Sequence, residues 1–355
     1  MMADWMIYGA NGFTGRLMAI EAAQRGMRPV LAGRNRSAIE SLAAELGLTS
    51  CVVDLGETEK LKDALQKMKL VMHCAGPFSA TSQPMIAACL ASQTHYLDIT
   101  GEISVFENAW KMDDAAKRAD VLLCPGAGFD VVPTDCLAAR LVEALPSATS
   151  LTLAFEPGGG PSPGTAKTSL EGMSQGGRVR RAGKLTKVPL AWKTRNIPFQ
   201  HADRAAVTIP WGDVFTAWVS TGVPDIEVYL SLPAARIQKL RRMRFIQPLF
   251  KYQWLQNFLK KRIEKNVPGP DQQLRTNSQT QLWGEVVSVD GRSVSATMQT
   301  PNGYDITVTA GLGIVEHLLE NEVTGGYMTP SLLMGSGYAE SLPGVSIQLT
   351  EQKDA

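Results

Sequence analysis

The sequence contains no stretch of 18 or more apolar residues, which is about the length that a membrane-spanning helix requires. It also lacks an excess of either charge, because 35 Lys and Arg residues face 34 Asp and Glu residues. Proteins that bind nucleic acid usually carry a strongly basic domain, so we expect no nucleic-acid partner. With 44% hydrophobic residues over 355 positions, the chain is long enough for one large domain or two ordinary ones.

Cysteine and histidine are scarce and scattered. The five cysteines include no C-x-x-C pair, and the four histidines form no cluster. We therefore predict reduced thiols in the core, with no disulfide and no metal site. The first residues show no basic stretch followed by an apolar core, so no secretory signal is predicted. Together these absences predict a cytoplasmic protein.

The first 146 residues alternate short apolar runs with helical patterns, the second of which has Ser37 as its predicted N-cap. Strands that alternate with helices of about 10–15 residues indicate crossover connections and a parallel sheet. We predict a Rossmann-type, doubly wound α/β domain over residues 1–146 with about six strands. The predicted strands span residues 5–8, 29–33, 51–55, 70–75, 95–99 and 121–126.

Three glycines at every third position follow the first predicted strand and open the first predicted helix. Gly9 allows a tight turn, Gly12 lets the backbone approach a pyrophosphate, and Gly15 lets the helix pack closely. A glycine-rich turn between a strand and a helix predicts a dinucleotide site, with the diphosphate at the helix N-terminus. The predicted ligands in this turn are Gly9, Asn11, Gly12, Phe13, Thr14 and Gly15.

The end of the second predicted strand distinguishes the two dinucleotides. NAD sites usually place an acidic residue there, to bind the ribose 2′-hydroxyl. This chain has Arg34, Asn35 and Arg36 instead. A guanidinium pairs with a phosphate through two parallel hydrogen bonds, whereas a carboxylate would repel it. The sequence therefore predicts NADP(H) as the cofactor, with Arg34 as the main ligand of the 2′-phosphate.

The carboxyl ends of the remaining strands complete the predicted site, because ligands of doubly wound sheets bind at that edge. Asp54 follows the third strand and is predicted to accept a hydrogen bond from the adenine amino group. The loop of Ala75, Gly76 and Pro77 follows the fourth strand and is predicted to lie along the ribose and nicotinamide.

Four residues are candidates for stabilising charge or moving a proton during a hydride transfer. They are Tyr96, Asp98, Asp130 and Lys167. Burial would raise the pKa of an aspartate here and allow it to act as an acid. The alternative for each aspartate is a purely structural role, as a helix cap or a loop anchor.

The pattern changes after residue 146. Alternating apolar and polar residues predict strands at 149–155, 205–211, 214–221, 225–232, 280–291 and 292–300, with a hairpin turn in "VDGRS". We predict a second, α+β domain over residues 147–302, built on a largely antiparallel sheet. Residues 306–322 are predicted to form a helix.

Five stretches in this order resemble the saccharopine dehydrogenase-like NADP-binding family: "GANGFTG", "AGRNR", "CAGPF", "YLDITGE" and "PGAGFDVVPTD". Within it, the chain resembles the trans-acting enoyl reductases more than the lysine-pathway enzyme. The resemblance implies NADP-dependent reduction of a carbon–carbon double bond in an acyl or polyketide-like substrate. It also implies that residues 303–355 pack back on the first domain. Two alternatives are a saccharopine-type reductase acting on a C–N bond and a non-catalytic NADPH-binding scaffold.

The C–N alternative would need several cationic residues facing the substrate, and residues 176–184 are the only cluster that supplies them. A second basic segment, residues 236–265, carries leucines and aromatics on a helical face that Pro248 interrupts. It is either a contact surface for a carrier protein or a membrane, or a pair of packed helices with solvated basic faces. The expected partners are a small-molecule or carrier-bound acyl substrate and a second copy of the chain in a homodimer.

Overall fold

The computed structural model describes residues 5–158, 170, 172, 176–245, 252–266 and 278–352. The chain divides into two compact units, and each includes a late segment of the sequence. The first consists of Met1–Asp130 and Ile306–Leu333, and the second of Val131–Asp305 and Met334–Ala355. Lys167 and Pro248 lie outside the described residues.

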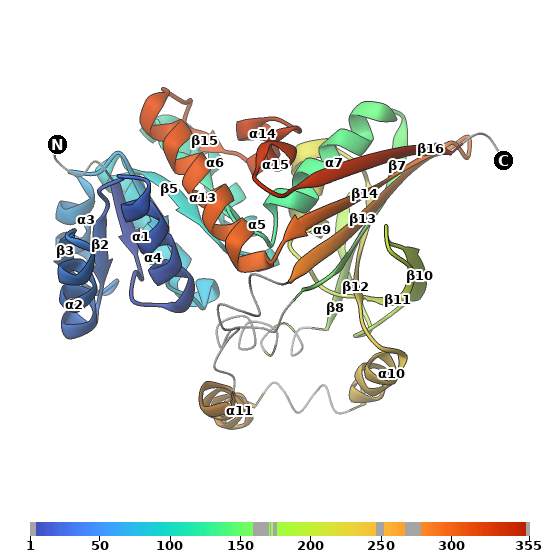
Figure 1. Ribbon diagram of the computed structural model, residues 1–355, viewed down its shortest axis with the longest axis horizontal. Coiled ribbons are helices and arrows are strands. Elements are labelled where there is room, and N and C mark those ends of the chain that lie inside the picture. The colour runs from blue at the N-terminus through green and yellow to red at the C-terminus, as the bar shows by residue number, and fades with distance from the viewer. Residues whose placement is uncertain are drawn as a thin grey trace. The chain divides into compact units, whose positions relative to one another are not determined.

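The first unit is built on a parallel sheet, which confirms the predicted fold class. Its order among the described residues is β15-β6-β5-β4-β1-β2-β3, with seven strands (Figure 1). Strands β1, β2, β4 and β5 are buried at every position, as expected for a sheet covered on both faces. The strands are β1 (Trp5–Tyr8), β2 (Val30–Gly33), β3 (Thr49–Val52), β4 (Leu70–His73), β5 (His95–Asp98), β6 (Leu122–Cys124) and β15 (Gly326–Tyr327).

Helices connect these strands, and the first unit also contains most of α13, which comes much later in the sequence. Gly311 in α13 explains this packing, because a Cβ there would run into Met18, Met72 and Ala127 of the first unit. The helix predicted for residues 306–322 therefore forms and lies against the first sheet's core. The helices are α1 (Phe13–Gln24), α2 (Arg36–Leu46), α3 (Thr58–Leu65), α4 (Phe78–Ser92), α5 (Ile103–Lys111), α6 (Asp113–Ala119) and α13 (Gly303–Glu320).

The second unit is built on a mixed sheet of nine strands in the described part of the chain. Its main path runs β10-β11-β12-β7-β13-β14-β16, while β8 pairs with β12 and β9. Among the described strands only β12 and β7 pair in parallel, so the sheet is largely antiparallel, as predicted. The strands are β7 (Ala148–Glu156), β8 (Gly177–Arg181), β9 (Lys184–Val188), β10 (Thr194–Pro198), β11 (Asp203–Thr208), β12 (Asp225–Ser231), β13 (Gln279–Ser288), β14 (Ser293–Pro301) and β16 (Ser346–Gln352).

Helix α7 packs on one face of this sheet, because a Cβ on Gly284 of β13 would lie 2.6 Å from Leu141 of α7. Residues 214–221 were predicted as a strand, and this prediction is wrong, since they lie in the helix α9. The helix is largely buried, and its polar residues Asp213 and Thr216 are buried too, so they do not form an exposed polar face. The helices that lie wholly in this unit's segments are α7 (Val132–Ala144), α9 (Asp213–Thr221), α10 (Ala234–Met243), α11 (Gln253–Asn266) and α15 (Tyr338–Ser341). Helix α14 (Pro330–Met334) ends at the first residue of the second segment.

Two segments lie elsewhere than the predicted boundaries place them. Helix α7 precedes residue 147 but belongs to the second unit. Strand β16 lies within the segment 303–355 that was predicted to return to the first domain, yet it pairs with β14 in the second sheet. The second sheet thus takes its edge strand from the end of the chain (Figure 1).

The basic segment 236–265 contains α10 and α11. Ile237 of α10 is buried and packs with Val207 of β11 and with Ala191, which lies between β9 and β10. Arg244 donates hydrogen bonds to the carbonyl oxygens of Leu190 and Ala191. Helix α10 is therefore anchored to the second unit. No helix among the described residues is long and apolar enough to cross a membrane.

Candidate functional site

The turn after β1 contains two glycines that the packing of the chain itself requires. Gly9 has a φ of +81°, and a Cβ there would lie 2.7 Å from the backbone nitrogen of Ala75. A Cβ on Gly15 would run into the carbonyl oxygen of Gly9. A Cβ on Gly12 would meet that same oxygen at 3.2 Å, a milder contact. The first and third glycines therefore close the turn, and the second leaves an open approach to the backbone.

The helix that follows this turn begins without a side-chain cap among the described residues. Helix α1 starts at Phe13 after Gly12, and its first turn carries no acidic residue. The start of a helix presents backbone N–H groups and a partial positive charge, which favour an anion. A dinucleotide pyrophosphate fits this place, because the backbone supplies donors and Gly12 leaves room for the ligand.

The three residues after β2 differ in what their side chains already contact. Arg34 is exposed, and it makes no ion pair with any residue that the structure describes. The Arg36 Nη1 atom lies 2.8 Å from Glu40 Oε1. Asn35 Oδ1 accepts a hydrogen bond from the Ala38 nitrogen at 3.2 Å, so Asn35, and not the predicted Ser37, caps α2. Arg34 is therefore the guanidinium of this turn that is available to a phosphate.

The other predicted cofactor contacts lie at the carboxyl ends of β3 and β4. Asp54 uses one carboxylate oxygen to accept a hydrogen bond from the Gly56 nitrogen at 2.9 Å, which closes its own turn. The loop of Ala75, Gly76 and Pro77 follows β4, and the Thr81 hydroxyl lies 2.6 Å from the carbonyl oxygen of Ala75. This loop is thus held against α4 and beside Gly9, next to the turn at the end of β1.

Glu102 fixes the start of α4 from a distant part of the sequence. Its Oε1 atom accepts a hydrogen bond from the Phe78 nitrogen, and its Oε2 atom accepts one from the Ser79 nitrogen, both at 2.9 Å. A carboxylate in this position satisfies two backbone donors at a helix start and complements the helix dipole. Glu102 was not predicted as a site residue.

Asp98 links the ends of β5 and β6. Its Oδ2 atom accepts a hydrogen bond from the Tyr96 hydroxyl at 2.6 Å. Its Oδ1 atom accepts bonds from the nitrogens of Thr100 and Gly126, both at 2.9 Å. Burial raises the pKa of Asp98 to about 6, although these hydrogen bonds act in the opposite direction. Both side chains are fully buried, so this geometry favours the structural role for Tyr96 and Asp98.

Asp130 lies farther along the loop after β6. A Cβ on Gly101 would lie 2.6 Å from Asp130 Oδ2, so the carboxyl group packs directly against this glycine. Burial and then the charge of Glu102 raise the pKa of Asp130 to about 7. The same glutamate also raises the pKa of Asp98. Among the catalytic candidates that the structure describes, Asp130 has the pKa nearest to neutral pH, which suits the exchange of a proton.

The Glu102→Ala variant is expected to lose about 1–2 kcal/mol of unfolding free energy, because two backbone donors at the start of α4 lose their partner. It should also lower the pKa of Asp130, since a neighbouring negative charge is removed. Chemical denaturation measures the first effect, and a carboxyl carbon NMR titration measures the second. Glu107→Ala is a matched control, because Glu107 forms an ion pair with Lys111 at the surface of α5. Equal behaviour of the two variants would contradict the anchoring role.

The contacts of Glu102 were not predicted, because its partners Phe78 and Ser79 lie in another helix. A second group of residues was also missed, in the second unit: Glu156, His201, Gln279, Gln281 and Gln299. The spacing of Gln279 and Gln281 in "QTQLW" was a usable signal, because alternate residues of a strand share a face. In the described parts of the chain, no three His, Cys, Asp or Glu side chains are grouped to hold a metal ion.

Comparison with known proteins relates the first unit to a family. Residues 5–124 match the saccharopine dehydrogenase NADP binding domain. A saccharopine dehydrogenase-like oxidoreductase of Bos taurus is 28% identical over 152 residues, covering 37% of this chain and 35% of that protein. A trans-acting enoyl reductase of Mycobacterium leprae (strain TN) is 31% identical over 142 residues, covering 37% of this chain and 34% of that protein. The matched region therefore spans about a third of the length of these relatives.

A solved structure resembles both units. Apo histidine-tagged saccharopine dehydrogenase (L-Glu forming) from Saccharomyces cerevisiae has a TM-score of 0.65 with this chain. The alignment covers 98% of this chain and 100% of that one, at 11% sequence identity. This likeness shows that the two proteins share a fold. The sequence match adds that residues 5–124 are an NADP-binding domain, in agreement with the predicted cofactor.

Proposed function

Because residues 5–124 belong to the saccharopine dehydrogenase NADP-binding domain family, we propose that this chain is an NADPH-dependent reductase. Its proposed acceptor is the carbon–carbon double bond of an acyl or polyketide-like substrate. The similarity of the first unit to a trans-acting enoyl reductase supports this acceptor. One observation favours a carbon–carbon double bond over a C–N bond as the acceptor. It is that the arginines of the cationic cluster at residues 176–184 already have partners within the protein.

The arginines of that cluster are engaged within the second unit. Arg180 is buried, and its Nε atom donates a hydrogen bond to the carbonyl oxygen of Val214 at 2.8 Å. Its guanidinium also lies 4.1 Å from the ring centroid of Trp218. Arg181 forms an ion pair with Glu227. A substrate with several carboxylates needs cations that are free to pair with it, so these contacts favour a neutral acyl acceptor.

The proposed chemistry assigns each role to a residue of the first unit. The turn from Gly9 to Gly15 holds the pyrophosphate, and Arg34 holds the 2′-phosphate. When bound, NADPH supplies a hydride for the β-carbon of the double bond. The α-carbon then requires a proton, and the protonated carboxyl group of Asp130 is the proposed donor. Water afterwards returns a proton to the Asp130 carboxylate.

The Asp130→Asn variant is expected to lower kcat about a hundredfold, the lower end of what general acids contribute, without changing the affinity for NADPH. Because the donor must be protonated, the wild-type rate should fall as the pH rises through about 7, which is the pKa of Asp130. The rate of the Asp130→Asn variant should not show this fall with pH. Steady-state rates between pH 5 and 9 test both points. If the variant loses a hundredfold in kcat but its rate still falls with pH as in the wild type, then another group causes the fall in rate.

Fluorescence titration with NADPH, NADP, NADH and NAD is the experiment that tests the cofactor. Tight binding of NADPH with weak binding of NADH is the expected result. A turnover screen of enoyl-thioesters against pairs of an α-keto acid and an amine then tests the acceptor. Consumption of NADPH with the thioesters alone supports the proposal. Binding without turnover in either set would favour the non-catalytic scaffold.

Partners beyond the substrate remain predictions. The segment 236–265 is proposed to contact a carrier protein or a membrane surface, and the chain is proposed to form a homodimer. In support of a contact surface, Phe258 of α11 is 57% exposed and Arg262 in the same helix is exposed. An exposed aromatic beside a cation suits both an acidic carrier and a lipid surface.

A further inference from the structure

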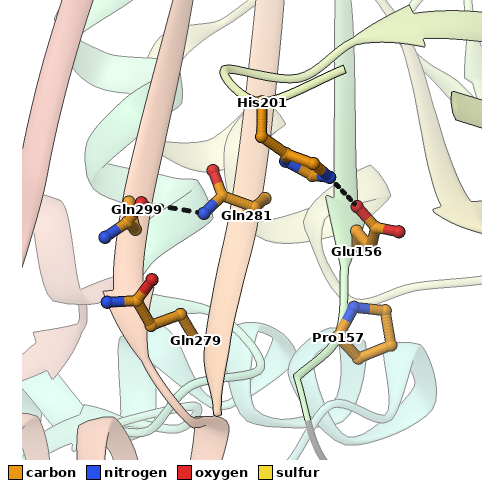
Figure 2. Close-up of a pocket in the computed structure, with 6 residues that line it drawn as sticks. All are labelled: Glu156, Pro157, His201, Gln279, Gln281 and Gln299. Atoms are coloured by element: carbon orange, nitrogen blue, oxygen red, sulfur yellow. Dashed lines mark hydrogen bonds and ion pairs between the residues drawn. The ribbon is translucent and has the colours of Figure 1, made fainter. Parts of the chain in front are cut away.

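A row of polar side chains crosses three neighbouring strands of the second sheet. Gln281 of β13 lies directly opposite Glu156 of β7 on one side and Gln299 of β14 on the other. Directly opposite residues of a ladder share a face of the sheet. Gly284, three positions after Gln281, faces Leu141 of α7, so the polar row points to the opposite face. Figure 2 shows these side chains gathered on that face.

This row forms the floor of a pocket. The pocket has a volume of about 410 Å³, and its other lining residues are Pro157, Gln279 and His201. His201 reaches it from the turn between β10 and β11, and Gln279 precedes Gln281 by two residues on the same strand. All six lining residues belong to the second unit. The volume lies within the range of small-molecule sites and far exceeds the roughly 30 Å³ of one water molecule.

Two acceptor atoms in this pocket lack a hydrogen bond within the described residues. Gln281 Nε2 donates to Gln299 Oε1 at 2.9 Å, but Gln281 Oε1 is buried without a partner. Glu156 Oε2 lies 3.2 Å from His201 Nε2, without hydrogen-bond geometry. A buried acceptor that finds no donor costs about 1–3 kcal/mol. A ligand with donors on neighbouring atoms would recover this free energy.

The charges around the pocket select the chemical class of that ligand. The Glu156 carboxylate repels anions, and its other oxygen already lies 3.4 Å from Arg204 Nε, which reduces its pull on cations. Carboxamide groups supply both donors and acceptors, and a hydroxyl group can satisfy either kind. We propose that this pocket binds a neutral, polyhydroxylated ligand such as a sugar or a cyclic polyol. Its hydroxyl groups accept from the glutamine amides and, once the two side chains turn toward the ligand, donate to Gln281 Oε1 and Glu156 Oε2.

Saturation-transfer NMR and calorimetry on the full chain test this proposal with three probes: methyl β-glucoside, myo-inositol and the anion gluconate. The Glu156→Gln variant keeps the shape of the side chain and removes the charge. The Gln281→Leu variant removes the unpartnered acceptor. Gln348→Leu is the matched control, because Gln348 is exposed on β16 opposite Thr297 of β14, on the same face but outside the pocket. Near-UV circular dichroism confirms the fold of each variant.

The expected result is binding of at least one neutral probe, weakened about tenfold by Glu156→Gln and by Gln281→Leu and unchanged by Gln348→Leu. Three results would overturn the proposal: no neutral probe binds at concentrations on the order of 50 mM, gluconate binds as well as the neutral probes, or the control weakens binding as much as the pocket variants. NADPH affinity should stay the same in all three variants, so these outcomes are independent of the proposed reductase function.

Discussion

Replacing Arg34 with glutamate is expected to weaken NADPH binding about a hundredfold, because a guanidinium–phosphate pair is lost and a repulsive carboxylate replaces it. NADH binding should stay the same or strengthen, since a carboxylate at this position can accept a hydrogen bond from the ribose 2′-hydroxyl. This expectation rests on the turn after β2, where Arg34 is exposed and makes no ion pair with a described residue. Fluorescence titrations of the wild type and the variant with NADPH and with NADH measure the change in each affinity.

The matched control for this prediction is Arg36→Glu, two residues away. Arg36 already pairs with Glu40 one turn along α2, so its charge is partly neutralised. We expect a loss of about threefold or less in NADPH affinity, in line with the small worth of exposed ion pairs. If Arg36→Glu weakens NADPH binding more than Arg34→Glu does, then Arg36 is the main ligand of the 2′-phosphate. Unchanged binding in both variants would remove the NADP preference from this turn altogether.

Replacing Asp98 with alanine is expected to cost about 3 kcal/mol of unfolding free energy. Three buried donors, from Tyr96, Thr100 and Gly126, lose their acceptor, at about 1 kcal/mol or more each. Asp98→Asn should cost less, because its carbonyl oxygen can still accept from the two backbone nitrogens. Urea denaturation measures both variants. A loss below about 1 kcal/mol for the alanine variant would show that Asp98 does not hold the ends of β5 and β6 together.

The pH dependence of the Asp98 variants has a definite sign. Burial raises the pKa of Asp98 to about 6, above the ordinary value of 3.8, so the folded state binds a proton more tightly than the unfolded state. Stability from this group is full at low pH and is lost as the pH rises through about 6. The Asp98→Asn variant lacks this loss, so its stability relative to the wild type should increase between about pH 4 and pH 7.

Strands β1, β2, β4 and β5 were predictable because each is a short apolar run between turns, buried on both faces. The edge strand β3 is exposed or half-buried, and it lies at Thr49–Val52 instead of the predicted 51–55. Strand β15 was not predictable, since it consists of only Gly326 and Tyr327 and has no pattern of its own. Helix α9 was mistaken for a strand because its β-branched and aromatic residues favour extended structure. Its burial within the second unit outweighs that preference, and its polar residues Asp213 and Thr216 are buried together with the apolar ones.

The candidate site divides in the same way between local and distant contacts. The turn from Gly9 to Gly15 is local, so spacing and strand context were enough to identify it. Glu102 acts on Phe78 and Ser79, more than twenty residues away, and no short pattern encodes that contact. The opposition of Glu156 and Gln281 depends on the register of two strands that are far apart in the sequence. Such a register cannot be inferred from either strand alone.

The interleaving of the two units also sets an order of assembly during synthesis. The first unit is discontinuous, since Met1–Asp130 is completed by Ile306–Leu333. A nascent chain that has emerged only as far as Asp130 lacks α13, whose Gly311 packs against Met18 and Met72, and it lacks the strand that covers β6. Its core and one sheet edge would stay exposed while residues 131–305 are translated. Native closure of the first unit therefore awaits the synthesis of Ile306–Leu333.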